Sequence, residues 1–255
     1  MKKVSLMAMF ALILSHVVLG CSVNEDRLQY SCDPAINKLV STNLPIVWKM
    51  NRTVWLKLRE DFKRAVYRAF TPLQRKELWI AKFAELQSLN WTEKERAHIA
   101  EAEQFFMQHN ELYSNAKLSD EESNMIDLFF ATWMKSAESE LGWDKGIAIS
   151  VAGTPNRIVD TKGTIEIVKR GLMLDYKKGV VLYDNVEVID TADYTGGELP
   201  DDTTGLSSST DCHCTDKVLS DFCFPLTCTS NWVKCNVTEK GCGWGWQQTC
   251  NGVCN

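Results

Sequence analysis

The chain has 255 residues, a formal net charge of −5 and ten cysteines. The charge is mild, and in the C-terminal part three lysines balance three acidic residues, so the sequence does not indicate a nucleic-acid partner. After residue 20 no stretch reaches the roughly 20 apolar residues that a membrane-spanning helix needs. We therefore expect a mature chain that does not span a bilayer.

The first twenty residues have the organisation of a secretion signal. Lys2 and Lys3 give a positive start, the run from Val4 to Leu19 carries no charge, and Gly20 stands where a signal peptidase requires a small residue. The apolar run is also shorter than a membrane-spanning helix. The sequence therefore predicts an exported protein.

The end of this signal resembles a bacterial lipobox. In Val18-Leu19-Gly20-Cys21, the cysteine would receive a diacylglyceryl group and become the new N-terminus. Ordinary cleavage after Gly20 also fits, because Val18 and Gly20 are acceptable three and one residues before the cut. Lipidation of Cys21 would leave Cys32 as an odd cysteine, whereas without lipidation the two could pair.

Three capping boxes mark helix starts within residues 52–143. They pair Thr71 with Gln74, Thr92 with Glu95 and Ser119 with Glu122. In each box the hydroxyl caps the first turn, and the side chain three residues later bonds back to the capping residue. Pro72 supports the first box, because proline is favoured at the first helical position.

Apolar residues recur at helical spacing after each of these starts. The three stripes are Trp79, Phe83 and Leu86; Ile99, Phe106 and Tyr113; and Ile126, Phe129, Phe130, Trp133, Ala137 and Leu141. Such stripes could line a ligand groove, but this spacing favours core packing. With the short connections between the helices, it predicts an antiparallel bundle of about four helices.

Short β-branched runs follow from Gly146 onward, separated by glycines and by a turn signal at Asp184-Asn185, and predict a small sheet beside the helices. The runs are Ile147–Val151, Thr164–Val168, Val180–Tyr183 and Val186–Ile189. Residues 195–210 then lack apolar periodicity and are rich in Gly, Ser and Asp. We expect an exposed linker there, open to proteolysis.

Eight of the ten cysteines fall within the 43 residues from 212 to 254. They are Cys212, Cys214, Cys223, Cys228, Cys235, Cys242, Cys250 and Cys254. A domain of this size buries too little apolar surface to fold without covalent links, and an exported chain meets oxidising conditions. Zinc is the alternative use of clustered cysteines, but the segment has no C-x-x-C pair. The pattern favours four disulfides, and their pairing stays open.

Four motifs of this cysteine-rich segment resemble the fulvocin C-related bacteriocin family. They are Asp211-Cys212-His213-Cys214, the step from Cys223 to Cys228, Gly241-Cys242-Gly243-Trp244-Gly245-Trp246, and Cys250-Asn251-Gly252. The resemblance covers about the last 45 of the 255 residues. It implies a bacteriocin-like tail behind an export signal and a long leader-like region. The gaps after Cys214 and Cys250 are wider than this pattern leads us to expect.

Aromatic residues are numerous for so small a segment. We expect Trp232, Trp244 and Trp246 to include surface contacts, because tryptophan suits interfaces that are partly apolar and partly wet. The alternative is that these rings fill the disulfide core. Gly243 and Gly245 flank Trp244 and would allow a tight turn that presents its ring.

The sequence contains no recognisable catalytic arrangement. His98 and His109 fall in one predicted helix without a metal-ligand spacing, and His213 lies between two cysteines. Glu138 and Glu140, two apart on a helix, point in different directions. We therefore predict no catalytic residues, no metal site and no cofactor, and a protein that is not an enzyme.

Together these features predict a mainly α protein: a helical bundle, a small β region and a disulfide-rich mini-domain. The expected organisation is a signal peptide over 1–20, an N-terminal segment over 21–51, the bundle over 52–143, the β region over 144–194, a linker over 195–210 and the mini-domain over 211–255. The leading hypothesis is a bacteriocin-like precursor that presents or releases its tail, with the envelope or membrane of a target cell as partner. The alternatives are a cell-surface lipoprotein with a binding tail and a self-protection protein of the producer.

Overall fold

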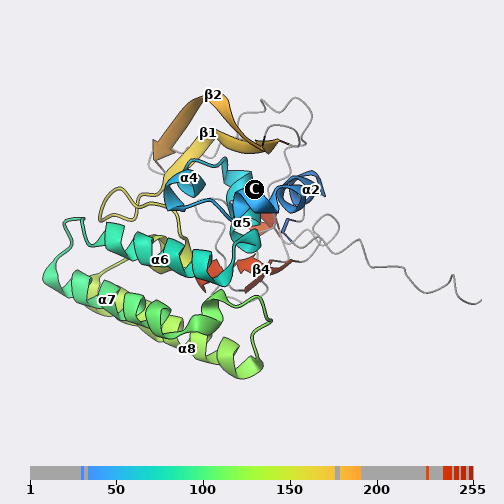
Figure 1. Cartoon of the computed structure of the whole chain (residues 1–255). Helices are drawn as coiled ribbons and strands as arrows, with labels where there is room; N and C mark the ends of the chain where they lie inside the picture. The colour runs from blue at the N-terminus through green and yellow to red at the C-terminus, as the bar shows by residue number, and fades with distance from the viewer. Residues whose placement is uncertain are drawn as a thin grey trace, which may run out of the picture.

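The computed structural model describes residues 30–31, 34–175, 179–190, 228–229, 238–242, 244–246, 248–250 and 253–254. This part of the chain is mainly helical, as the sequence predicts, and it is shown in Figure 1. The expected signal peptide, Cys21, Cys32 and the linker over 195–210 lie outside it. None of the helices described is both long and apolar enough to cross a bilayer.

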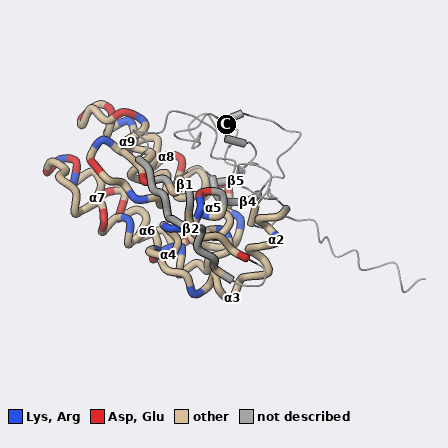
Figure 2. Tube along the Cα trace, turned by 90° about the horizontal axis from the view of Figure 1, so that it is seen from above, with Lys and Arg blue, Asp and Glu red and all other residues tan. Residues whose placement is uncertain are grey.

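We call residues 34–190 the body and residues 211–255 the tail. The helices of the body are α2 (Pro34–Thr42), α3 (Leu44–Val47), α4 (Arg52–Leu56), α5 (Glu60–Ala69), α6 (Pro72–Leu86), α7 (Glu93–Gln108), η1 (Asn110–Tyr113), α8 (Asp120–Ser136), η2 (Ala137–Leu141), α9 (Lys145–Ala148) and η3 (Ile149–Gly153). Helices α6, α7 and α8 lie side by side in Figure 1. Both charge signs occur along α6 and α7 (Figure 2).

All three predicted capping boxes are confirmed. Thr71, Thr92 and Ser119 are the N-caps of α6, α7 and α8, and each accepts a hydrogen bond from the backbone N–H three residues later. Gln74 and Glu95 bond back to the N–H of the capping residue, at 3.1 and 2.8 Å. The helix starts were predictable because each depends on only four consecutive residues.

The predicted apolar stripes form the core of the body. Between α6 and α7, the rings of Phe83 and Phe106 lie 5.2 Å apart. Between α7 and α8, Phe105 stacks on Phe129 at 3.8 Å. The expected stripe residues are buried, apart from two that are partly buried, Phe129 and Leu141. The segment before residue 52 also contributes, because α2 and α3 bury Val40 and Val47 completely.

The prediction of a strand over Ile147–Val151 is wrong. Asp144 caps a helix there, with its carboxylate accepting from the N–H of Ile147 at 2.9 Å, and the helix continues through η3. Residues 149–153 are all buried. A short apolar run that is buried on every side has no polar face, so its periodicity cannot distinguish a strand from a helix.

One β-hairpin forms the expected β region. Strands β1 (Glu166–Asp175) and β2 (Gly179–Asp190) pair antiparallel, with Glu166 opposite Asp190 and Asp175 opposite Gly179. The runs predicted as two strands, 180–183 and 186–189, belong to one strand, because Asp184 and Asn185 do not form the expected turn. The hairpin is labelled above α4 in Figure 1.

Backbone hydrogen bonds attach this hairpin to the body. Leu172 donates to the carbonyl of Lys57 at 2.8 Å, and Arg59 donates to the carbonyl of Leu172 at 3.0 Å. Strand β1 therefore passes directly against the residues that join α4 to α5. Gly171 allows this approach, since a Cβ built there would lie 2.3 Å from the carbonyl oxygen of Lys57.

The described parts of the tail are short paired strands and one tight turn. Strand β3 (Cys228–Thr229) pairs with β6 (Val253–Cys254), and β4 (Thr238–Cys242) pairs with β5 (Gln248–Cys250), both antiparallel. The turn η5 (Trp244–Trp246) lies between β4 and β5 along the chain. We call it the Trp-Gly-Trp loop. Figure 1 shows β4 beside α5, so the tail contacts the body.

Candidate functional site

The Trp-Gly-Trp loop is buried against aromatic side chains of the body. Trp244 and Trp246 are each only 2 % exposed. The rings that they contact come from three helices that are far from the tail in sequence, and the loop also lies against η3. We call these body residues the aromatic site: Trp55 on α4, Arg64 and Tyr67 on α5, and Phe130 and Trp133 on α8.

Trp244 stacks on α8. Its ring lies 4.4 Å from that of Phe130 with an interplanar angle of 7°, and it meets Trp133 edge-on at 6.3 Å. Aromatic pairs in such geometry contribute about 0.5–1.5 kcal/mol beyond the area that they bury. Phe130 is itself fully buried, so this contact belongs to the core.

Trp246 packs against residues of α4 and α5. It meets Tyr67 edge-on at 5.1 Å and Trp55 at 5.9 Å. The guanidinium carbon of Arg64 lies 4.3 Å from the Trp246 ring centroid, within cation–π distance. The ring is thus enclosed by aromatic edges and one cation.

Hydrogen bonds fix the backbone of the loop as well as its rings. The hydroxyl of Tyr67 donates to the carbonyl of Gly245 at 3.0 Å, and the indole N–H of Trp79 donates to the same hydroxyl at 3.1 Å. The loop shape depends on a left-handed backbone, with φ of 60° at Gly245 and 57° at Trp246. Glycine adopts this conformation freely, whereas a residue with a side chain loses about 1–2 kcal/mol.

The predicted surface exposure of Trp244 and Trp246 is therefore wrong. A buried tryptophan removes about 150–250 Å² from water. At about 25 cal/mol per Å², each ring gains as much as about 4–6 kcal/mol from the aromatic site. Trp232, the third tryptophan of that prediction, lies outside the described residues.

The eight tail cysteines are only partly described. The backbones of Cys228 and Cys254 are directly opposite one another in the β3–β6 pair. Cys242 and Cys250 lie on the paired strands β4 and β5, opposite Gln248 and Thr238 respectively. The other four tail cysteines lie outside the described residues: Cys212, Cys214, Cys223 and Cys235.

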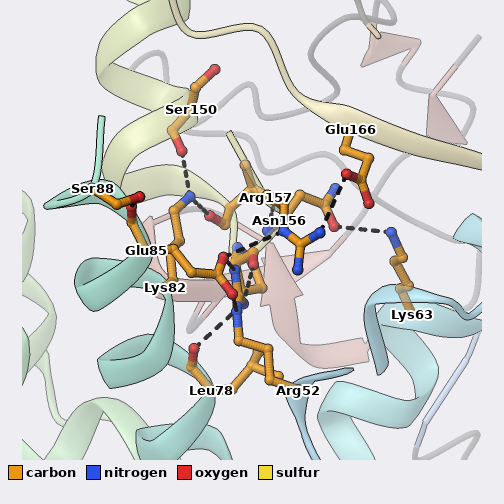
Figure 3. A network of polar contacts seen from close by, with 12 residues as sticks. Arg52, Lys63, Leu78, Lys82, Glu85, Ser88, Ser150, Asn156, Arg157 and Glu166 are labelled. Carbon is orange, nitrogen blue, oxygen red and sulfur yellow. Dashed lines mark hydrogen bonds and ion pairs between the residues drawn. The ribbon is translucent and has the colours of Figure 1, made fainter. Parts of the chain in front are cut away.

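A polar network, drawn in Figure 3, joins α4, α5 and α6 to residues 150–166. The guanidinium of Arg52 binds both carboxylate oxygens of Glu85, at 2.9 and 2.8 Å, and donates to the carbonyl of Pro155 at 2.6 Å. Arg157 reaches Glu85 at 3.8 Å and Glu166 at 3.6 Å. The bidentate Arg52–Glu85 pair is the stronger kind of ion pair because its geometry is fixed.

Lys82 lies at the centre of this network and is 1 % exposed. Its ammonium donates to the carbonyls of Ser150 and Thr154, and it lies 5.5 Å from the ring centroid of Trp79. Burial lowers the pKa of Lys82 well below its usual value, and the charge of Arg52 lowers it further, against the opposite effect of Glu85.

A buried lysine with a lowered pKa is a feature of some catalytic sites. In this case both acceptors of Lys82 are backbone carbonyls, one at Ser150 within η3 and one at Thr154 directly after it, and the side chain is closed to substrate by its burial. The arrangement therefore satisfies the last carbonyls of a buried helix, which would otherwise be unpaired. This arrangement was not predicted from the sequence, although Lys82 directly precedes Phe83 on the apolar stripe of α6.

The polar network adjoins the aromatic site. Lys63 donates to Glu60 at 2.6 Å and to Asn156 at 3.3 Å, and its ammonium lies 5.4 Å from the Trp55 ring. The indole N–H of Trp55 donates to the carbonyl of Lys63 at 3.0 Å. Trp55 is thereby fixed in the position where it meets Trp246, so the network supports one wall of the aromatic site.

His98 lies on the other side of the aromatic site, behind Trp133. It stacks on the Trp133 ring at 4.6 Å, and the Trp133 indole donates to the His98 carbonyl at 2.9 Å. Burial lowers the pKa of His98, while Glu101 and Glu140 act in the opposite direction. Among the described residues, no group of three or more His, Cys, Asp or Glu side chains could hold a metal ion.

No protein-family model, curated protein or solved structure matches this chain.

Proposed function

We propose that this chain is an exported, bacteriocin-like protein whose body carries a disulfide-rich tail and keeps the contact residues of that tail buried. The single observation that carries the proposal is the burial of Trp244 and Trp246 in the aromatic site. The resemblance of the tail to the fulvocin C-related family is the reason for proposing a bacteriocin-like protein. The export signal and the cysteine count are consistent with that class.

Burial of the two tryptophans would have a direct functional consequence. Tryptophan side chains prefer the boundary between an apolar phase and water, so an exposed Trp-Gly-Trp loop suits a membrane or an envelope surface. In the intact chain the same rings are buried against the body and cannot reach such a surface. Cleavage within 195–210 would break the covalent link between body and tail and open a route to the exposed form.

Several roles follow for the remaining parts of the chain. Residues 1–20 direct export, and a lipid on Cys21 would hold the intact protein at the envelope. Four disulfides among the tail cysteines would give the tail its shape. The partner is the envelope or membrane of a target cell, and the protein acts by contact rather than by catalysis.

The second candidate is a cell-surface lipoprotein whose tail is a binding module that is never released. The same burial also supports this function, because the loop shares one core with the body, and its separation would expose both tryptophans and Phe130. The candidates differ in the state of the tail after export. Mass spectrometry of the membrane fraction and the culture medium would find an intact chain for the lipoprotein and a separated tail for the precursor.

The activity test uses a tail that folded as part of the whole protein. The oxidised full chain, with a specific protease site placed within 195–210, is cut, and the tail is then separated from the body under denaturing but non-reducing conditions. We expect this tail to inhibit sensitive strains, and the uncut chain to be inactive. A tail with Trp244→Ala is the matched control and should be weaker. Absence of inhibition by an oxidised tail with native bridges would overturn the bacteriocin-like function.

A further inference from the structure

We propose that the aromatic site is a binding site for the Trp-Gly-Trp loop that retains the tail after the backbone between them is cut. The partner is thus the tail itself, bound without a covalent link to the body. The body would then act as an inhibitor of its own tail, a role that rests on the proposed function, whereas the binding does not.

Every described contact of the loop with the aromatic site is non-covalent and lies outside the predicted linker. The contacts join Trp244 to α8 and Trp246 to α4 and α5. None of them involves residues 195–210. A cut in that segment therefore removes the tether but leaves both aromatic contacts and the Tyr67–Gly245 hydrogen bond in place. The tether contributes only effective concentration.

The contacts have the character of a specific binding site. Two tryptophans, one arginine and a hydrogen-bonded tyrosine are the residue types that dominate binding energy at protein interfaces. The Gly245 carbonyl is placed for the Tyr67 hydroxyl only when Gly245 and Trp246 adopt a left-handed backbone. The aromatic site therefore recognises the backbone conformation of the loop as well as its two rings, and an unfolded tail would not bind to it.

Two features of Trp246 limit the strength of this binding. Its φ of 57° is unfavourable for a residue with a Cβ. Its indole N–H is buried and makes no hydrogen bond within the described part of the chain, which is unusual for a tryptophan. At a membrane surface the same N–H meets polar acceptors while the ring stays in contact with apolar material. The bound state is thus stable in water and open to competition by a lipid surface.

The experiment uses the oxidised full chain with the protease site in 195–210. After complete cutting, the sample is passed over a size-exclusion column at micromolar concentration under non-denaturing conditions, and body and tail are followed by non-reducing gel. We expect the tail to elute with the body. Addition of phosphatidylglycerol-containing vesicles should transfer the tail, but not the body, to the lipid fraction.

Variants assign the retention to the aromatic site. Trp244→Ala and Tyr67→Phe should each weaken retention, the first by at least about tenfold in Kd, as for a central interface tryptophan. Tyr67→Phe keeps the ring, and comparison with Tyr113→Phe, which removes a hydroxyl contact inside the body, separates loss of binding from loss of folding. Leu128→Ala, on the exposed side of α8 where the side chain is 71 % exposed, is the matched control and should leave retention unchanged.

The proposal is overturned if the cut wild-type tail elutes separately from a folded body, or if Tyr67→Phe and Trp244→Ala retain the tail as well as wild type does. These outcomes are independent of killing. A tail that is retained but inactive against cells would support the binding site and contradict the bacteriocin-like function. A tail that kills cells but is not retained would support the bacteriocin-like function and contradict the binding site.

Discussion

The hydroxyl of Tyr67 and the carbonyl of Gly245 are joined by a 3.0 Å hydrogen bond between residues 178 positions apart in the sequence. The same hydroxyl accepts from the indole of Trp79. A short chain of polar contacts therefore runs from the core of the body, through α5, to the loop of the tail. It is one of the contacts by which the cysteine-rich tail and the helical body share one interior.

Tyr67→Phe should destabilise the full chain by about 1–2 kcal/mol, because it removes the Gly245 contact and leaves the Trp79 donor without its acceptor. Urea unfolding of the oxidised protein measures the change. Tyr113→Phe is a suitable comparison, since its hydroxyl donates to the Phe106 carbonyl at 2.9 Å inside the body. It should cost a similar amount of stability yet leave tail retention intact. Equal retention in both variants would contradict the role assigned to Tyr67.

Phe130→Ala should destabilise the chain by about 3–5 kcal/mol, since the ring is fully buried and stacks on Trp244. Leu128→Ala, two residues away on the same helix and 71 % exposed, should change stability by no more than about 0.5 kcal/mol. Thermal or urea unfolding of both variants tests the pair. Similar losses would mean that this face of α8 is not the one that packs against the tail.

The helical part of this fold was largely predictable from local sequence. Capping boxes depend on residues three apart, and the stripes that contain Phe83, Phe106 and Phe130 depend on helical spacing within one element. These features report which face of a helix is apolar. They do not report which residues pack against that face. Phe130, for example, packs against Trp244, which lies more than a hundred residues later in the sequence.

The aromatic site was missed for this reason. Trp244 and Trp246 were predicted to lie at the surface because a segment of about 45 residues has little core of its own in which to bury them. That argument treats the tail as a separate unit. The contacts to Tyr67 and Phe130 give both rings a core in the body instead, and no local pattern around Gly245 signals such a partner.

Gly171→Ala should destabilise the chain, by about 1–3 kcal/mol as for other overpacked sites. The new Cβ would lie 2.3 Å from the carbonyl oxygen of Lys57 and 2.5 Å from a methyl group of Val168, so β1 must move away from the residues before α5. Gly142→Ala tests a different cost, because its φ is 69° with no neighbour within 4 Å of a Cβ. Amide exchange should show loss of protection at Leu172 only in the first variant. Full protection of the Leu172 amide in Gly171→Ala would indicate that the hairpin is not attached to the body at Leu172.

Cys228 and Cys254 should form one of the tail disulfides. They are register partners in the β3–β6 pair, and directly opposite Cα atoms in antiparallel strands are about 4.5–5.5 Å apart, within the usual span of a disulfide. A non-reducing peptide map of the oxidised full chain should contain the two cysteines in one linked fragment. Partial reduction separates this bridge from others nearby. A map that links either cysteine to a different partner would contradict this bridge.

Acidification should weaken the body through His98. Burial lowers its pKa below the usual value of about 6.5, so the unfolded chain binds the proton more readily than the folded one. Stability is therefore fully present above about pH 6.5 and falls as the pH drops toward the folded pKa. Protonation places a charge against the Trp133 ring, on which His98 stacks, and Trp133 also meets Trp244. Urea unfolding between neutral pH and pH 5 should show a loss of stability that is reduced in His98→Gln. An equal loss in His98→Gln and in the wild type would contradict the role assigned to His98.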